Sequence, residues 1–397
     1  MTKFEEDPEN SCYSEHYTDP DALVVDACRH SFNFFFSGTE RLTALLNLIG
    51  NANDSLKMCF YIFQADRAGQ LLLQALVLAA QRGVSVQLIV DAFGSSATQT
   101  FFTPFQKAGG TVHFFQSRWN THYLIRNHQK FIIADNEVVM TGGFNIGDRY
   151  FSSPKSNSWC DVGVIIKGDV VAKFVEWFGT LNQWVISPRP KFFELNRSIQ
   201  SWSNGKGKVQ LLMGGPSQMT SAWARAVKRD LAKAQNFDLA MAYFSPPRSI
   251  RRLIRKVSRK GRANLVIAGK SDNPTTLGAS RALYGTLLKD NVEISEFKRC
   301  KLHMKLLVID NITYFGSANF DFRSIRLNIE LMVRVEDNKL ATEMRNVIST
   351  MAEKSEHITQ AWYKRRASII NRVRWRISWF LVSVIDYTVA RRLNVDA

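Results

Sequence analysis

Apolar runs and amphipathic stretches alternate along the chain, in the order expected of strands and helices. LKMCFYIF (56–63) and VSVQLIV (84–90) are short apolar runs that predict buried strands. Between them, AGQLLLQALVLAAQR (68–82) has the length and composition of a helix. An earlier helix is predicted from a cap at Thr39 to about Asn51. Helix and strand alternating in this way indicate an α/β sheet.

The same order of elements returns in the second part of the chain. Two segments correspond in order and residue type: RNHQKFIIADNEVVMTGGFN (126–145) and KLHMKLLVIDNITYFGSANF (301–320). The strand that contains Tyr61 likewise corresponds to FDLAMAYFSP (237–246). Matching residues keep a nearly constant separation over most of each half. The sequence therefore predicts one fold used twice.

Composition divides the chain into five parts. The first 26 residues hold eight acidic side chains and one basic side chain, which predicts a solvated arm. Ser, Pro and Gly mark a linker, whose Phe192, Phe193 and Trp202 either pack on the domain seam or contact lipid. The expected parts are an acidic arm (1–36), a first domain (37–186), the linker (187–208), a second domain (209–350) and a basic tail (351–397).

Composition and charge narrow the class of protein. A hydrophobic content of 45% excludes disordered and fibrous chains. Lys and Arg outnumber Asp and Glu by 52 to 35, a net charge of +17 that predicts attraction to nucleic acid or to an anionic membrane surface. The five cysteines are scattered without a CxxC pair, so neither a disulfide framework nor a zinc knuckle is indicated, and reduced thiols in a cytosolic setting are expected.

Each half carries a His-x-Lys-x4-Asp motif, followed by a Gly-Gly or Gly-Ser step and an asparagine. If the residues after each histidine form a strand, His128 and Lys130 project from one face, and so do His303 and Lys305. An imidazole beside a fixed cation suits attack at an anionic phosphate. The motif offers no second metal ligand on the same face, and its lysine would repel a cation, so no metal is predicted there.

These motifs, together with YIF, AYFSP, IAGKSD and SANFDFRSIRLNIE, make the sequence similar to the phospholipase D superfamily, and within it to bacterial cardiolipin synthases. The resemblance covers residues 37–350. It implies an α/β fold of two tandem phospholipase D-like domains, with duplicated mixed sheets related by a pseudo-twofold axis and one active site at the seam. It also implies that no cofactor is required.

The resemblance assigns roles to residues of both motifs. One histidine attacks phosphorus to form a phosphohistidine, and the other protonates the leaving alkoxide; the family's usual order makes His128 the nucleophile and His303 the acid. A carboxylate downstream of each motif, Asp161 or Glu330, is expected to orient the histidine of that motif. The expected catalytic residues are His128, Lys130, Asn145, Asp161, His303, Lys305, Ser317, Asn319 and Glu330. Expected structural residues of the motifs are Asp135, Asp310, Gly142, Gly143 and Gly316, with Tyr61 and Tyr243 as weaker candidates for substrate binding.

The function that follows from the resemblance is transfer of a phosphatidyl group from phosphatidylglycerol to a second phospholipid, with release of glycerol. Two alternatives remain open in the enzyme class: a phospholipase D hydrolase and a nuclease-type phosphodiesterase, both with water as acceptor. A catalytically silent scaffold is disfavoured, because binding alone does not require two complete motifs.

Two basic regions indicate where the protein acts. An arginine stripe recurs at helical spacing and is either a solvated face or a contact for anionic headgroups: Arg248, Arg252, Arg255, Arg259 and Arg262. In the tail, ISWFLVSVI (377–385) is too short to span a bilayer, and its basic and tryptophan neighbours predict an interfacial helix; the alternative is a helix docked on the protein's own core.

The expected partners are therefore anionic phospholipids and a membrane surface, with no nucleic acid. Because the N-terminus has no apolar signal sequence and no segment is long enough to span, we expect a peripheral protein on the cytoplasmic face of the bacterial inner membrane.

Overall fold

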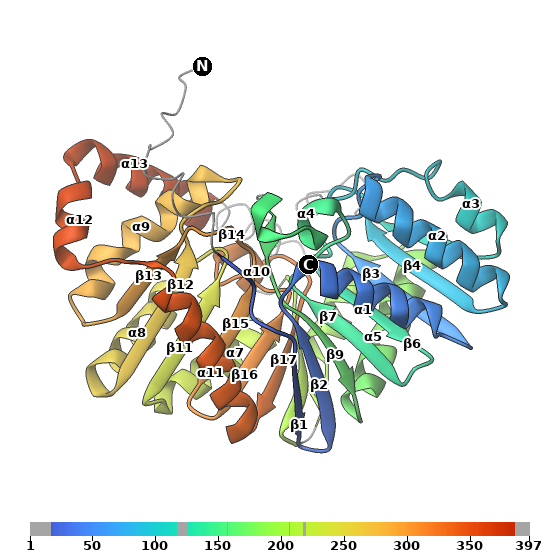
Figure 1. Ribbon diagram of the computed structural model, residues 1–397, viewed down its shortest axis with the longest axis horizontal. Helices are drawn as coiled ribbons and strands as arrows, with labels where there is room; N and C mark the ends of the chain where they lie inside the picture. Colours follow the sequence, from blue (N-terminus) through green and yellow to red (C-terminus); the bar gives the residue numbers. More distant parts are fainter. Residues whose placement is uncertain (1–16, 117–124, 157, 206, 217–219, 386–397) are drawn as a thin grey trace.

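The computed structural model describes residues 17–116, 125–156, 158–205, 207–216 and 220–385. Two mixed sheets of eight strands, one from each half of the chain, lie side by side (Figure 1). The first has the order β1-β2-β9-β7-β6-β3-β4-β5, with strands β1 (Leu23–Ala27), β2 (His30–Phe35), β3 (Ser55–Phe60), β4 (Ser85–Asp91), β5 (Thr111–Phe115), β6 (Lys130–Ala134), β7 (Val138–Gly142) and β9 (Gly163–Lys167).

The second sheet has the order β10-β17-β16-β15-β11-β12-β13-β18. Its strands are β10 (Val209–Gly214), β11 (Asn236–Met241), β12 (Arg262–Ala268), β13 (Glu293–Phe297), β15 (Lys305–Ile309), β16 (Ile312–Gly316), β17 (Glu330–Glu336) and β18 (Glu356–His357). From β2 to β5 the first order matches the second from β10 to β13, position by position. The duplication predicted from the sequence is confirmed, and so is the α/β fold class.

Helices connect the strands and cover the sheets. They are α1 (Gly38–Gly50), α2 (Arg67–Gln81), α3 (Thr103–Lys107), α4 (Asp148–Phe151), α5 (Val170–Ile186), α6 (Phe192–Gln200), α7 (Ala222–Lys233), α8 (Arg248–Lys260), α9 (Pro274–Leu288), α10 (Phe322–Arg326), α11 (Asn338–Glu353), α12 (Gln360–Arg366) and α13 (Ile369–Phe380). A 3₁₀ turn at Pro154–Ser156 and a π turn at Leu381–Ile385 complete the set. In the parts of the chain that are described, no helix is both long and apolar enough to cross a bilayer.

The predicted strand–helix–strand unit is present with shifted ends. Helix α2 begins after Asp66, whose side chain accepts a hydrogen bond from the Gly69 amide, and it connects the parallel neighbours β3 and β4. Helix α1 begins one residue before the Thr39 expected to cap it, with Ser37 at the N-cap position.

The acidic arm is not solvated along its whole expected length. Residues 1–16 lie outside the described residues, but β1 and β2 form an antiparallel hairpin at the edge of the first sheet. Cys28 and Arg29, both with positive φ, make the two-residue turn. Alternate side chains such as Val25 and Phe32 are buried, while charged Asp26 points outward. The acidic composition masked this period-two pattern in the sequence.

The linker also has structure of its own, because it contains α6. Phe192 and Trp202 pack against the central core, and the Trp202 ring meets that of Trp177 edge-on at 5.6 Å. Phe193 is 44% exposed. Packing on the seam is therefore the correct reading for two of the three linker aromatics.

The arginine stripe is largely paired within the protein. Arg255 and Arg259 both bond Asp290. Arg262 lies on β12 and not on α8, so the stripe is shorter than the spacing predicted, and it pairs with Asp238 and Glu293. These contacts favour the solvated-face reading over headgroup binding.

One hydrophobic core runs through both halves. Phe131 and Trp177 of the first half belong to the same buried cluster as Leu306 and Phe315 of the second. Helix α5 packs on β10, and α11 packs on β1, so each half places a helix against a strand across the seam. The Phe315 ring lies 5.6 Å from that of Phe34. The two halves are therefore held together by burial of apolar surface.

We expect Phe315→Ala to destabilise the whole molecule, because it removes a fully buried ring at the seam. The loss should be about 3–5 kcal/mol, measured as a lower midpoint of denaturant unfolding. Phe193→Ala, which removes a ring of the same size from an exposed position, should change the free energy of unfolding by less than about 0.5 kcal/mol. Equal effects of the two substitutions would contradict a shared core.

Candidate active site

Each motif histidine precedes a central strand and is bonded through its backbone to the other half. The His128 amide donates to the Ile329 carbonyl at 2.9 Å, and the His303 amide donates to the Cys160 carbonyl at 2.8 Å. A short parallel pair of strands from different halves, β8 (Trp159–Cys160) and β14 (Lys301–Leu302), leads into His303. Both histidines therefore lie at the seam, one from each half.

The carboxylates orient the histidines crosswise. Nδ1 of His128 lies 2.9 Å from Glu330 Oε1, and Nδ1 of His303 lies 2.6 Å from Asp161 Oδ2. The expectation that each carboxylate serves the histidine of its own motif is wrong. The backbone pairing gives the reason: Ile329 is bonded to residues 126 and 128, so the next side chain, Glu330, reaches the first histidine.

The environment keeps both rings neutral in the free enzyme. Burial lowers the pKa of His128 to about 4, against the opposing effect of Glu330. Burial and then Lys305 lower the pKa of His303 to about 3, against the effect of Asp161. A neutral ring that donates its Nδ1 proton to a carboxylate has an unprotonated Nε2. Each histidine therefore presents one nucleophilic or basic nitrogen.

Two buried lysines accompany the rings. Lys130 donates to the carbonyl of His128, and Lys305 Nζ lies 2.9 and 3.0 Å from the two ring nitrogens of His303. Burial lowers the pKa of Lys130 to about 7, although Glu330 raises it, and that of Lys305 to about 8, although Asp161 raises it. Each lysine also lowers the pKa of the other half's histidine, so the four groups share one electrostatic environment.

The two half-sites differ at the step after each motif. In the second half, the Ser317 hydroxyl donates to Glu330 at 2.5 Å, and Ser324 donates to its other oxygen at 2.8 Å. In the first half, a Cβ on Gly143 would come within 2.5 Å of Asp161 Oδ1 and 3.0 Å of Lys305. Glycine is therefore needed where the second half has serine. Ser317, expected to hold phosphoryl oxygens, is instead bonded to Glu330.

The asparagines and aspartates of the motifs have different surroundings. Asn145 Oδ1 accepts from the Ile62 amide at 3.1 Å, and its Nδ2 donates to the Tyr150 hydroxyl at 2.9 Å. The side-chain oxygen of Asn319 is buried and has no hydrogen-bond partner among the described residues. The Asp135 carboxylate accepts hydrogen bonds from the backbone amides of residues 53–55, and the Asp310 carboxylate accepts them from the amides of residues 235 and 236. Gly142 and Gly316 end β7 and β16.

Aromatic rings flank both histidines. The centroids of the Tyr61 and His128 rings lie 4.9 Å apart, and Lys130 Nζ lies 5.3 Å from the centroid of the Tyr61 ring. His303 is contacted by Trp159 at 4.9 Å and Tyr150 at 5.3 Å, centroid to centroid. Burial raises the pKa of Tyr243, which follows β11 as Tyr61 follows β3.

Sequence reasoning missed four residues of this site: Arg41, Tyr150, Trp159 and Ser324. Fully buried Arg41 donates to the carbonyls of Asp161, at 2.7 Å, and Tyr150, at 2.5 Å. Trp159 stands two residues before Asp161, and Tyr150 lies between the first motif and that carboxylate, so their neighbourhood in the sequence was the available signal. Nothing in the local sequence marked Arg41.

Chemically, the cluster suits an anion with a reactive phosphorus centre. Two lysines supply positive charge in a buried site, where it is weakly screened, and two neutral imidazoles each present one nitrogen. A metal cation would be repelled by the same lysines. The arrangement favours nucleophilic displacement at phosphate.

Comparison with known proteins agrees with this chemistry. A family model described as "Cardiolipin synthase, PLD-like domain" matches residues 45–182 and 227–352. A cardiolipin synthase of Listeria monocytogenes is 31% identical over 352 residues, which are 84% of this chain and 71% of the relative. Cardiolipin synthase 1 of Staphylococcus epidermidis is 29% identical over 358 residues, covering 87% of this chain and 72% of that protein.

A solved structure shows the same fold. The phosphatidylserine synthase of Haemophilus influenzae superposes with a TM-score of 0.69, covering 94% of this chain and 96% of that chain at 14% sequence identity. The family match spans both halves and both motifs, and the structural match extends over nearly the whole chain. The chain therefore belongs to the cardiolipin synthase PLD-like domain family and is an enzyme of the phospholipase D superfamily.

Proposed function

We propose that the protein transfers a phosphatidyl group from phosphatidylglycerol to a second phospholipid through a phosphohistidine, with release of glycerol. The observation that carries this is the crosswise pairing of two neutral histidines with buried carboxylates beside two buried lysines. The named function of the similar Listeria and Staphylococcus proteins supports the choice of lipid substrates.

In the first step, Nε2 of His128 attacks phosphorus, and the bond from phosphorus to the glycerol oxygen breaks. When the anionic phosphodiester binds, His303 takes up a proton from solvent at Nε2 and then gives it to the leaving alkoxide. Its pKa of about 3 in the free enzyme is raised when an anionic phosphodiester lies beside it, because a nearby negative charge favours the protonated ring. Glu330 stabilises the positive ring of the phosphohistidine.

In the second step, the roles reverse. His303, now neutral, takes the proton from the acceptor hydroxyl, whose oxygen attacks phosphorus as the bond to His128 breaks. Lys130 and Lys305 stabilise the negative charge that builds on the phosphoryl oxygens in both steps. In this scheme, the side-chain amides of Asn145 and Asn319 donate hydrogen bonds to the phosphoryl oxygens.

The tail supplies a surface for membrane binding. One face of α13 packs on α9, with Trp375 buried and Gly278 allowing Ser378 to approach. The opposite face exposes six large apolar side chains: Ile369, Ile370, Val373, Ile377, Phe380 and Leu381. The structure shows a helix docked on the protein's own surface, and its exposed apolar face supports the prediction of an interfacial helix.

Positive charge lies next to the apolar face. A groove of about 420 Å³ between α9, α12 and α13 is lined by Lys289, Lys364, Arg372 and Arg376 together with Tyr363 and Trp375. None of these four cations has a carboxylate partner among the residues that the structure describes. We infer that α13 rests on an anionic bilayer, with its apolar face among the acyl chains and the groove near headgroups. The later basic residues of the tail, Arg391 and Arg392, lie outside the described residues.

His128→Ala should reduce phosphatidyl transfer by about 10³-fold or more, and His303→Ala by about 10²–10⁴-fold, because each removes a group that acts in both steps. The assay follows labelled phosphatidylglycerol in mixed micelles, with products resolved by mass spectrometry. His357→Ala, an exposed histidine on β18, is the matched control and should leave the rate unchanged. A phosphatidyl adduct trapped on His303 of the unaltered protein would reverse the assigned roles.

The affinity for an anionic substrate should depend on pH, with an alkaline limb that is set by the two active-site lysines. Each lysine carries its charge only below its lowered pKa, so the affinity for an anionic phosphodiester inhibitor should fall as pH rises through about 7–8. Lys130→Arg, which remains charged, should move the alkaline limb toward the pKa of Lys305. A limb that stays in place in both Lys130→Arg and Lys305→Arg would assign it to another group.

The double substitution Ile370→Ser and Ile377→Ser should lower binding to anionic vesicles by about tenfold or more, since it removes two apolar side chains from the lipid-facing surface. Cosedimentation with vesicles measures the effect. Leu78→Ser is the matched control, because Leu78 on α2 is 57% exposed and Ile377 is 54% exposed. Turnover of a short-chain, water-soluble substrate should be unchanged. Vesicle binding that survives the double substitution would exclude α13 as the membrane contact.

A further inference from the structure

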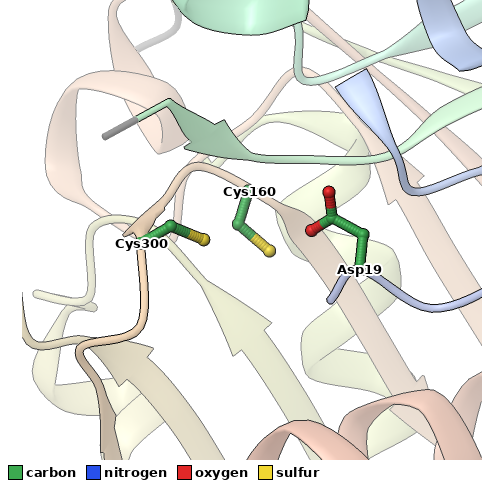
Figure 2. Close-up of side chains that lie close together, drawn as sticks. All are labelled: Asp19, Cys160 and Cys300. Atoms are coloured by element: carbon green, nitrogen blue, oxygen red, sulfur yellow. The ribbon is translucent and has the colours of Figure 1, made fainter. Parts of the chain in front are cut away.

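A cluster of three possible metal ligands lies beside the active site. Asp19 comes from the segment before β1, Cys160 from β8 and Cys300 from the residue before β14, and Figure 2 shows their side chains directed toward one another. One ligand atom of each lies within 4.8 Å of the others. Among the described residues, this is the one place where three such groups come so close together.

The carboxylate of Asp19 lacks a partner for one of its oxygens. Oδ1 is shielded from solvent and receives no hydrogen bond from the residues that the structure describes, while Cys160 interacts with the carboxylate. An unpaired buried carboxylate oxygen is costly unless a proton or a cation satisfies it.

The strand pairing explains why the thiols stand together. In the parallel pair β8–β14, Leu302 lies opposite Cys160, so Cys300 and Cys160 project from one face and Asp161 and His303 from the other. The contact of Trp159 with His303 lies on that second face. The thiols therefore occupy the reverse side of the strands that hold the catalytic pair.

Charge near the cluster suits a bound divalent cation. Two thiolates and a carboxylate carry three negative charges, and a divalent cation leaves one. Burial lowers the pKa of Arg41, while Asp161 and, to a smaller extent, the three residues of the cluster oppose that effect; its own hydrogen bonds go to carbonyl groups. The guanidinium therefore lies within electrostatic reach of both Asp161 and the cluster.

We propose that Asp19, Cys160 and Cys300 bind a divalent cation of the zinc type. Two sulfurs and one carboxylate oxygen are ligands that zinc accepts, and the fourth position falls to a water molecule or to the Tyr17 hydroxyl, 3.6 Å from Cys160 Sγ. Binding releases the two thiol protons to solvent. The ion joins the N-terminal segment to both halves, on the reverse side of His303.

The test begins with the intact full-length protein. It is purified with reductant, incubated with zinc or cobalt(II), freed of excess metal, and analysed for metal content by mass spectrometry and for absorption. We expect about one ion per chain, and in the cobalt form a thiolate-to-cobalt charge-transfer band in the near ultraviolet. No retained metal, with both thiols reactive after denaturation, would overturn the proposal without any substitution.

Variants locate the ion. Cys160→Ser, Cys300→Ser and Asp19→Asn should each lose most of the metal and the cobalt–thiolate band, whereas Cys28→Ser, whose thiol bonds the carbonyl of Glu336, should keep both. Circular dichroism confirms that the variants fold. Retention of the band in Cys160→Ser or Cys300→Ser would also overturn the proposal. So would a Cys160–Cys300 disulfide, seen as two fewer thiols in the denatured protein without reductant, because it would leave no thiolate for the metal.

Discussion

The active site depends on the crosswise hydrogen bonds between histidines and carboxylates at the seam. A buried carboxylate is unfavourable unless it is paired, and here each carboxylate finds its imidazole in the other half of the chain. Neither half can therefore complete its own histidine. The continuous core at the seam, with Phe315 packed on Phe32 and Phe34, holds the halves at the distance these pairs require.

The duplicated halves have become unequal where they meet. Asp161 is one methylene shorter than Glu330 and lies against Gly143, which leaves no room for a hydroxyl like that of Ser317. Glu330 instead takes hydrogen bonds from two serines, and its histidine is the more exposed of the two, at 12% against 7% of the side chain. His303 lies under Lys305 and has the lower pKa of the two rings. These differences give two chemically distinct histidines in one site, in keeping with the different roles that we propose for them.

The residues of the site could be predicted from the sequence, but the contacts between them could not. Two copies of the motif and the alternation of a strand were enough to predict His128 beside Lys130 and His303 beside Lys305, and to predict the duplicated sheet. The exchange of carboxylates was not predictable, because it follows from the bridge between residues 127 and 329, a long-range pairing. Arg41 acts through backbone carbonyls, which leave no pattern in the sequence. The β1–β2 hairpin was missed because its charged residues outweighed its alternating apolar ones.

The strands β8 and β14 show how much a period of two can determine. One face of this pair brings Asp161 and His303 together, and a shift of β14 by one residue would turn His303 away and bring Cys300 to that face instead. The thiols are 140 residues apart, so their spacing gave no signal for a shared site, yet the parallel register places them side by side. A contact that holds this register, on either face, therefore also holds His303 on the carboxylate of Asp161. The two faces of one short strand pair are physically coupled, although only one of them carries the chemistry.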